Sequence, residues 1–176
     1  MKLHLETERL LLRELQPEDR EGLFLLDSNP KVHEFLGNQP IHTREEADAI
    51  IALVRKQYAE YGIGRWAVID KQTEEFIGWA GLKYEQKLRN FAYYDLGYRL
   101  REEYWGKGIA TEAASTALKY GFSVLKLDEI SAAASQANKA SIAILEKIGL
   151  TFRETFVYEN EVCNWYTISN IDQGDK

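Results

Sequence analysis

Apolar residues recur at the three- and four-residue spacing of an amphipathic helix in several parts of the chain. The clearest segment follows Thr43, which is a favourable N-cap and has Glu46 three residues later as the partner in a capping box. Gly62 then supplies a residue that can end the helix in a left-handed conformation. The apolar positions between them are Ala47, Ile50, Ile51, Val54 and Tyr58. The pattern predicts a helix between Thr43 and Gly62.

Three further helices are predicted from similar signals. Pro17, followed by Glu18 and Asp19, is typical of a helix start, because proline suits the first turn and acidic residues suit the positive end of the helix dipole. That helix should run to about Leu26. A second has the apolar stripe Ile109, Ala113, Ala117, Tyr120 and Val124. A third covers 138–148, with Ile142, Leu145 and Ile148 facing inward and Gly149 as its C-cap.

Alternating residues predict the strands, most clearly over 91–100. One face of this strand carries Ala92, Tyr94, Leu96, Tyr98 and Leu100, and the other carries Phe91, Tyr93, Asp95, Gly97 and Arg99. The other predicted strands are 7–15, 66–70, 75–82, 128–134, 151–159 and 162–169. The order of elements predicts a mixed α/β (α+β) sheet in a single domain over 3–170, with a short polar tail at 171–176. Its strand–helix junctions near 100–111 and 134–141 are expected to face one cleft.

Composition and charge narrow the functional classes. The length of 176 residues suits one domain. The net charge of −6 argues against a nucleic-acid binder and fits a cationic partner better. No apolar run is long enough for a membrane span, and the N-terminus has no signal-peptide core, so no membrane partner is expected. The single Cys163 favours a reducing cytoplasm. His4, His33 and His42 lack metal-ligand spacing, so no metal is expected.

The stretch YWGKGIATEA, residues 104–113, is the strongest candidate for a phosphate site. A Walker A loop fails, because Arg101 stands where its first glycine is needed and Gly108 follows Lys107. A dinucleotide fingerprint fails, because Thr111 stands at its third glycine. What remains is a Gly-x-Gly turn before a helix, where backbone N–H groups and the helix dipole can hold a phosphate. The glycines alone fit an ordinary strand–helix turn equally well.

Three segments together resemble the GNAT N-acetyltransferases, specifically the RimJ/RimL-like branch. They are TERLLLRELQPED, DLGYRLREEYWGKGIATEA and NKASIAILEKIGL, and the resemblance runs from about Glu6 to Ser169. It implies a mostly antiparallel sheet of about seven strands, flanked by helices and splayed to bind acetyl-CoA. Glu103 departs from the Gln or Arg that usually begins the loop motif.

The resemblance also assigns residues to the cofactor. It places the pyrophosphate on the turn formed by Trp105, Gly106, Lys107, Gly108, Ile109 and Ala110, with Thr111 nearby. Leu100 and Arg101 are expected to pair with the pantetheine arm in the manner of an added strand. Asn138 is expected to hold the CoA arm, and this role is compatible with that of an N-cap. Lys107 is expected to face solvent.

Acetyl transfer to an amine needs a base, and Asp95 is the first candidate, acting directly or through a water. The alternative is a structural acid that bonds a neighbouring strand or pairs with Arg99. Glu85 is a second candidate base, and Glu112 is expected to be structural. The resemblance suggests an oxyanion donor among the backbone N–H groups of 98–100.

The leaving thiolate needs little help, since a thiol has a pKa of about 8.5. Many relatives place a tyrosine just before Glu-Lys in the last helix, where this chain has Leu145. The branch-specific match for an acid is Ser141, whose alternative role is an ordinary first-turn residue. A covalent intermediate on Cys163 is not expected, because no histidine is adjacent and the cysteine lies in the apolar sequence VCNWYTI.

The acceptor side is less well defined. By analogy the loop around 32–36 and the helix after Thr43 form its walls. Trp66, Trp79, Tyr84 and Trp165 either line it or fill the core. The sequence thus predicts an acetyl-CoA-dependent N-acetyltransferase whose acceptor is a primary amine, either a protein N-terminus or a small molecule. Alternatives are a GNAT-like module that binds acyl-CoA as a sensor, and an ATP-dependent transferase, which both motif tests oppose. The oligomeric state stays open, with a homodimer among the options.

Overall fold

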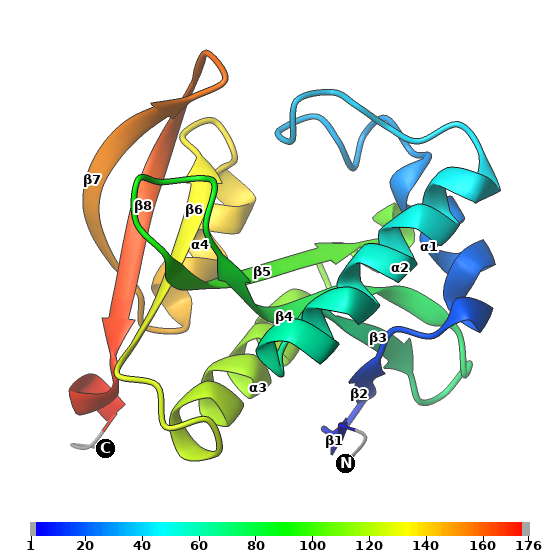
Figure 1. Cartoon of the computed structure of the whole chain (residues 1–176), viewed down its shortest axis with the longest axis horizontal. Helices are drawn as coiled ribbons and strands as arrows, with labels where there is room; N and C mark the ends of the chain where they lie inside the picture. Colours follow the sequence, from blue (N-terminus) through cyan, green and yellow to red (C-terminus); the bar gives the residue numbers. More distant parts are fainter. Residues whose placement is uncertain (1–2, 174–176) are drawn as a thin grey trace.

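The computed structural model describes residues 3–173, which form an open sheet flanked by helices (Figure 1). The described residues contain eight strands in the order β1-β2-β3-β4-β5-β6-β8-β7. Every neighbouring pair is antiparallel except β5 and β6, which run parallel. The strands are β1 (His4–Glu6), β2 (Leu10–Glu14), β3 (Trp66–Asp70), β4 (Phe76–Glu85), β5 (Tyr93–Leu100), β6 (Glu129–Ser135), β7 (Thr151–Tyr158) and β8 (Glu161–Ser169).

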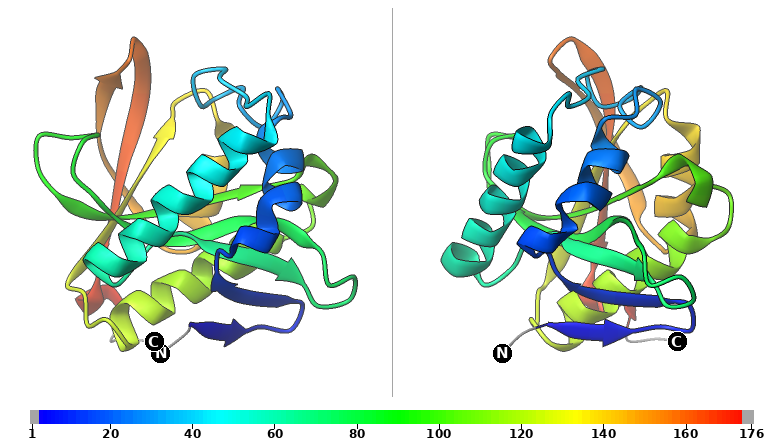
Figure 2. Two further views of the ribbon diagram at one scale, coloured as in Figure 1. Left: turned by 45° about the vertical axis from the view of Figure 1, so that its right-hand side comes forward. Right: turned by 90° about the vertical axis from the view of Figure 1, so that its right-hand side faces the viewer.

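The helices lie on both faces of the sheet (Figure 2). The α-helices are α1 (Arg20–Asp27), α2 (Arg44–Tyr61), α3 (Ile109–Ser123) and α4 (Lys139–Lys147), and short 3-10 turns cover Pro17–Asp19, Glu102–Tyr104 and Asn170–Gln173. One apolar cluster joins α1 and α2 to one face of the sheet, and a second joins α3 and α4 to the other. The face under α1 and α2 is called the front face below, and the face under α3 is called the back face.

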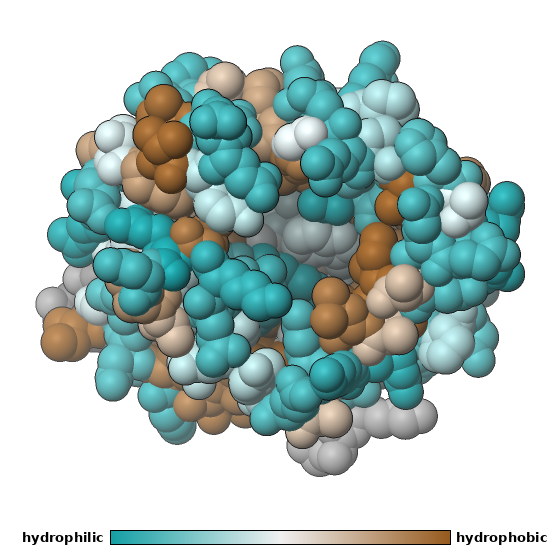
Figure 3. Space-filling model, turned by 45° about the horizontal axis from the view of Figure 1, so that its top comes forward, coloured by the Kyte–Doolittle hydropathy of each residue, from teal (hydrophilic) through white to brown (hydrophobic). Residues whose placement is uncertain are grey.

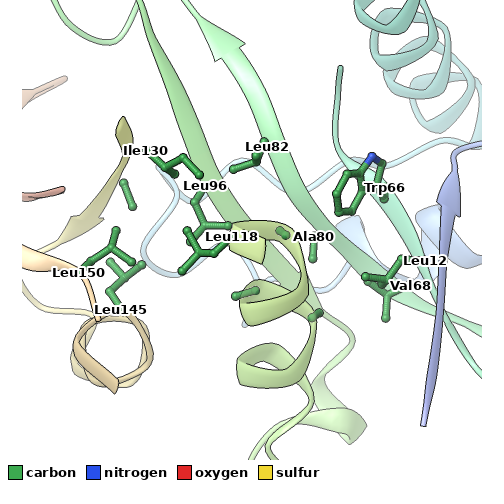
Figure 4. Close-up of a cluster of buried hydrophobic side chains, with 14 of the residues drawn as sticks. Leu12, Trp66, Val68, Ala80, Leu82, Leu96, Leu118, Ile130, Leu145 and Leu150 are labelled. Carbon is green, nitrogen blue, oxygen red and sulfur yellow. The ribbon is translucent and has the colours of Figure 1, made fainter. Parts of the chain in front are cut away.

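The back-face cluster holds most of the large buried side chains (Figure 4). Leu82 and Leu96 come from the sheet and meet Leu118 of α3, while Trp66 lies further along the same layer. Trp66 is 2% exposed and packs edge-on against Tyr120 of α3, so it belongs to the core rather than to an acceptor wall. Burying one such side chain stabilises the fold by roughly 1.5–3 kcal/mol.

The predicted caps of α2 and the predicted N-cap of α4 are confirmed, whereas the C-cap of α4 is Ile148 and the expected Gly149 follows it with φ +106°. The Thr43 side chain accepts from the N–H of Glu46 at 3.2 Å, and the Glu46 carboxylate accepts from the N–H of Thr43 at 2.9 Å. Gly62 ends α2 with φ +71°. Asn138 caps α4 through a bond from the N–H of Ser141.

Three expectations need correction. The segment 7–15 gives a shorter strand, β2, because Thr7 turns the chain back and its N–H bonds the carbonyl of Leu10. The preceding residues form β1, whose three residues are too few to show a pattern, so the sheet has eight strands. Val124 lies just beyond α3 and is 58% exposed, so it does not extend the buried stripe.

The last described element of the chain is a short 3-10 turn. The expected tail at 171–176 begins within the last 3-10 turn, and 174–176 lie outside the described residues. Across residues 3–173, no helix combines the length and the apolar character needed to cross a membrane.

Candidate active site

The central feature of the site is a split between β5 and β6. Within the described chain these two strands share a single bridge pair, Asp95 with Ser131, and beyond it they diverge. On its other side β5 stays paired with β4 over its whole length. The split therefore leaves one edge of β5, from Leu96 to Leu100, without a partner strand.

The hydrogen-bond alternation of the β4–β5 ladder shows which groups face the split. The N–H of Arg101 bonds the carbonyl of Ile77 at 2.9 Å, so odd-numbered residues of β5 direct their backbone groups toward β4. Even-numbered residues direct theirs the other way, into the split. The N–H and C=O of Tyr98 and the N–H of Leu100 thus line an open strand edge.

Two of the backbone groups predicted to contact the pantetheine arm already have partners within the protein. The carbonyl of Leu100 accepts a 2.9 Å bond from the indole N–H of Trp105, and the N–H of Arg101 is used by Ile77. Arg101 also pairs with Glu103 at 2.5 Å, which explains how an acidic residue is accommodated at the start of the loop. Leu100 therefore keeps only its N–H on the open edge, and Tyr98 adds its own N–H and C=O there.

The glycine turn lies at the end of this edge and opens α3. Gly106 and Gly108 have φ values of +71° and +75°, which favour glycine over any residue with a Cβ. A Cβ on Gly106 would meet no atom within 4 Å. Gly108 is the N-cap and has no side-chain cap bond, so the N–H groups of the first turn point outward without an acceptor among residues 3–173.

The turn is anchored from behind by residues near the N-terminus. The Arg9 guanidinium donates to the Lys107 carbonyl at 2.7 Å and pairs with Glu112 at 2.7 Å. Glu112 also accepts from the Thr7 hydroxyl at 2.5 Å and from the N–H of Arg9. Glu112 thus has the structural role expected of it, while Arg9 was not anticipated. The Lys107 side chain is exposed.

Of the remaining turn residues, Trp105 is 46% exposed and Ile109 is buried in the core beneath the turn. Ala110 and Thr111 lie in the first turn of α3 and are half-buried. An open turn with outward N–H groups fits a pyrophosphate, because the backbone donates and no side chain blocks the approach.

The other wall of the split is the start of α4, which bears Asn138 and Ser141. The Ser141 hydroxyl lies 3.0 Å from the hydroxyl of Tyr98, and the Tyr98 hydroxyl also donates to the Ser141 carbonyl at 2.9 Å. Burial raises the pKa of Tyr98 to about 12. Leu145 is 1% exposed and belongs to the core. Sequence reasoning gave the side chain of Tyr98 no role beyond its place on a strand face.

Asp95 lies on the front face where the split begins, and it is 8% exposed. Its Oδ2 forms an ion pair with Arg65, which also donates to the Asp95 and Gly81 carbonyls at 2.6 Å each. Burial raises the pKa of the Asp95 carboxyl, and the adjacent guanidinium of Arg65 opposes that rise. No hydrogen bond within residues 3–173 engages Oδ1, so this carboxylate oxygen can accept a proton or a hydrogen bond from another molecule.

The partner of Asp95 is therefore Arg65 and not Arg99. Arg99 pairs instead with Asp27 at 2.7 Å. Arg65 can lie across β5 only because residue 97 is glycine, since a Cβ there would be 2.6 Å from its Nη2. Arg65 stands before β3 with no pattern to mark it, which is why the sequence did not reveal it.

Glu85, the second candidate base, is paired with a lysine of its own strand and with backbone N–H groups of the following loop. Lys83 lies 2.8 Å away, and the N–H groups of Gln86 and Lys87 also bond the carboxylate. Burial works to raise the pKa of Glu85, but these bonds outweigh it and the pKa lies below its ordinary value. A lowered pKa makes Glu85 a weaker base than Asp95.

The walls expected for the acceptor lie over the front of β4 and β5. The 30–42 segment and the β7–β8 hairpin rise on opposite sides of it (Figure 1), and the surface seen from above is hollowed between them (Figure 3). Trp79 lies on this face, with Arg65 and Arg99 over its ring at 5.1 and 4.9 Å. His33 is buried 3.4 Å from Asp27, and burial lowers its pKa.

Aromatic rings cover the part of the front face nearest β7 and β8. Tyr93 packs edge-on against Trp165 at 4.6 Å, and Arg89 lies over the Trp165 ring at 4.7 Å and pairs with Glu154 at 2.5 Å. Trp165 is 5% exposed, so it fills this cluster more than it lines an open surface. Tyr84 stacks between two other tyrosines and is half-buried.

Covalent and metal chemistry find no support in the described part of the chain. Cys163 is half-buried rather than in the core, and burial raises the pKa of its thiol, which disfavours the nucleophilic thiolate. Residues 3–173 contain no group of three or more His, Cys, Asp or Glu placed to share a metal ion.

Comparison with known proteins gives consistent matches. Residues 9–151 match the family model described as an acetyltransferase (GNAT) domain. The chain is 35% identical over 146 residues to the uncharacterized N-acetyltransferase YoaA of Bacillus subtilis, covering 82% of this chain and 81% of that protein. It is 31% identical over 158 residues to the FsC-acetyl coenzyme A-N(2)-transacetylase of Aspergillus fumigatus, covering 86% and 66%.

Among solved structures, a GNAT-family acetyltransferase from Bacillus anthracis superposes with a TM-score of 0.81. It is 26% identical in sequence, and the match covers 96% of this chain and 99% of that one. The expected splayed, mostly antiparallel sheet is therefore confirmed, with one strand more than predicted.

Proposed function

The chain belongs to the GNAT acetyltransferase family and is an acetyl-CoA-dependent N-acyltransferase, and from this premise we propose that it transfers the acetyl group directly to a primary amine with Asp95 as general base. One observation carries the proposal. The split between β5 and β6 begins at a buried carboxylate and leads along an open strand edge to an open glycine turn. A donor thioester and an acceptor amine can meet there from opposite faces of the sheet.

We place the pyrophosphate of acetyl-CoA on the backbone N–H groups of 106–111. The helix dipole of α3 adds partial positive charge at this point, and the glycines admit the phosphates without a clash. The pantetheine amides then pair with the free edge of β5 at the N–H of Leu100 and the C=O of Tyr98, and Asn138 holds the arm from α4. Acetyl-CoA supplies the acyl donor, a thioester with a good leaving group.

The same edge supplies the oxyanion donor. The N–H of Tyr98 points into the split, where the thioester oxygen gains negative charge as the amine attacks. A backbone N–H is preorganised, because the β4–β5 ladder fixes it before the substrate arrives. Removing a comparable donor in other enzymes slows turnover by roughly 100- to 1,000-fold.

Asp95 removes the proton from the acceptor. Amines arrive mainly as ammonium ions, with a pKa of about 8 for an α-amine and 10.4 for a lysine. Burial raises the pKa of Asp95 and so strengthens it as a base, while Arg65 holds one carboxylate oxygen and leaves Oδ1 toward the acceptor or a bridging water. We expect kcat/KM to rise with pH until the acceptor amine is deprotonated.

For the acceptor, the front face favours a primary amine that carries few charges. The carboxylates of Asp27, Asp95, Glu85 and Glu154 are each paired with a cation. They offer no set of free anions for a polycation, although the chain as a whole is acidic. We therefore place protein N-terminal α-amines and small monoamines ahead of polyamines.

The direct test is release of CoA thiol with an acceptor panel of peptides, amino acids, monoamines and polyamines. We expect Asp95→Asn to lower kcat by roughly 100-fold or more, in the range of a lost general base. Glu85→Gln is the matched variant and should retain most activity. If Asp95→Asn matches the wild type with every acceptor that gives turnover, the base assignment is wrong.

A second candidate function is a module that binds acyl-CoA without transfer. The observation in its favour is the contact of Arg65 with Asp95, which occupies one carboxylate oxygen. Tight acetyl-CoA binding with no CoA release across the whole panel would select this function. Turnover with any amine would exclude it.

A further inference from the structure

Tyr98 and Ser141 join the two walls of the split through their side chains. Tyr98 comes from β5 and Ser141 from the first turn of α4, 43 positions later. The two hydroxyl oxygens are 3.0 Å apart, and the tyrosine hydroxyl lies 2.9 Å from the Ser141 carbonyl oxygen. This bond connects the proposed cofactor edge directly to the proposed proton donor.

The single hydroxyl proton of Tyr98 decides how the pair works. The hydroxyl lies within reach of both the carbonyl and the hydroxyl oxygen of Ser141, and when its proton is donated to the hydroxyl oxygen, the serine proton is left free for another acceptor. The serine oxygen is then fixed beside β5, the wall that carries the thioester, and its O–H can point to the sulfur instead of to the backbone of its own helix. Burial keeps Tyr98 protonated far above neutral pH, so it remains a donor throughout the working range.

The position along β5 brings this pair near the reacting sulfur. From its end at Leu100, before the glycine turn, to Asp95, β5 runs five residues, about 17 Å at roughly 3.3 Å per residue. The pantetheine arm that starts at the turn must end its thioester near Asp95, since the amine attacks there. Tyr98 lies between these points, and Ser141 faces it across the split.

We propose that Tyr98 is a positioning residue for the proton donor: its hydroxyl aims the Ser141 hydroxyl at the CoA sulfur as the carbon–sulfur bond breaks. This inference rests on the proposed function. The sulfur takes the electron pair of that bond and receives a hydrogen bond from Ser141, and no bond to either hydroxyl oxygen is made or broken. Tyr98 thus provides from β5 a hydroxyl beside Ser141, while Leu145 of α4 carries none.

The test measures the thiol of bound CoA and needs no acceptor. Thiolate formation is followed by ultraviolet absorbance while the pH of the CoA complex is raised. The Ser141 hydroxyl, held in place by Tyr98, stabilises the thiolate, so Tyr98→Phe and Ser141→Ala should each raise the pKa of the bound thiol by about half to one unit. The double variant should match Ser141→Ala, because Tyr98 acts through Ser141.

Turnover provides the second readout. Tyr98→Phe should lower kcat about fivefold to tenfold with the KM for acetyl-CoA within twofold, because the ring that packs in the split is retained. Tyr94→Phe is the matched control, since Tyr94 lies on the same face of β5 and its hydroxyl has no bond in residues 3–173. It should change neither quantity.

The outcomes separate cleanly. A normal bound-thiol pKa in Tyr98→Phe, with a shifted one in Ser141→Ala, would show that Tyr98 merely ties α4 to β5. Additive effects in the double variant would show that the two hydroxyls act independently. Either result overturns the inference while leaving the proposed function intact. Failure of the wild type to bind CoA would instead remove the proposed function, and this inference with it.

Discussion

The split beside β5 and the front face of the sheet are built from different kinds of groups. Toward the split, the site consists of backbone N–H and C=O groups, an open glycine turn and neutral hydroxyls. Toward the front face, it consists of charged side chains that are almost all paired, among them Asp95 with Arg65 and Asp27 with Arg99. The comparison suggests that cofactor binding depends on local backbone geometry, whereas acceptor chemistry depends on ion pairs between distant segments.

The ion pair should produce the largest effect, because charges buried together are costly to separate. Arg65→Met leaves the Asp95 carboxylate buried without its cation, and we expect a loss of about 3–5 kcal/mol in the free energy of unfolding at pH 7. Urea denaturation measures it. The double variant with Asp95→Asn should regain part of this loss, because no unpaired charge remains.

Lowering the pH should reduce the loss of unfolding free energy in Arg65→Met. In Arg65→Met the pKa of Asp95 rises further above its unfolded value, so protonation stabilises the folded state and the deficit shrinks as pH falls. A deficit that is small at pH 7, or that does not change with pH, would show that the pair contributes little.

At the glycine turn, one added methyl group should weaken acetyl-CoA binding more than its effect on stability explains. Gly106→Ala adds a Cβ at φ +71° and narrows the turn, so the Kd for acetyl-CoA should rise at least about tenfold. Gly62→Ala is the matched control, with the same φ and nothing within 4 Å of the added atom. Both should lose about 1–2 kcal/mol of stability from left-handed backbone strain. Equal Kd values in the two variants would contradict the placement of the pyrophosphate on this turn.

The anchor behind the turn should give a smaller and pH-dependent effect. Burial works to raise the pKa of Glu112, but bonds from Thr7 and Arg9 outweigh it and lower the pKa. The stabilisation is therefore present above the unfolded pKa, about 4.3, and is lost as pH falls through the folded value. Glu112→Gln should cost about 1 kcal/mol at pH 7 and almost nothing in strong acid.

The control for that anchor is Glu60→Gln, which removes an exposed helical pair with Lys56. It should change stability by less than about 0.5 kcal/mol at any pH. If the two variants have the same pH profile of unfolding, Glu112 does not anchor the turn.

The smallest effect is expected at Lys107. Its side chain is exposed and its nearest ring contact is Tyr104 at 5.5 Å. Lys107→Ala should raise the KM for acetyl-CoA by no more than about threefold, with the change disappearing at high salt, and leave kcat unchanged. A large drop in kcat would contradict its placement outside the reaction.

The same contrast explains what the sequence could predict. The strand alternation of 93–100, the caps of α2, the N-cap of α4 and the glycine turn are local patterns, and each lies where it was expected. Arg65, Arg9 and the Tyr98–Ser141 bond join segments separated by 30 to 103 positions. Such contacts follow from how the sheet is assembled, so no local signal indicates them. The short β1 was missed because three residues carry too little pattern.

The central claim is that acetyl-CoA lies in the split along β5, with its phosphates on the turn before α3. Amide hydrogen exchange with and without acetyl-CoA tests this claim most directly. We predict added protection at the N–H groups of Tyr98 and Leu100 and of residues 106–111, with no comparable change in β1–β3. Protection confined to other segments, or none along β5 and the turn, would contradict the account.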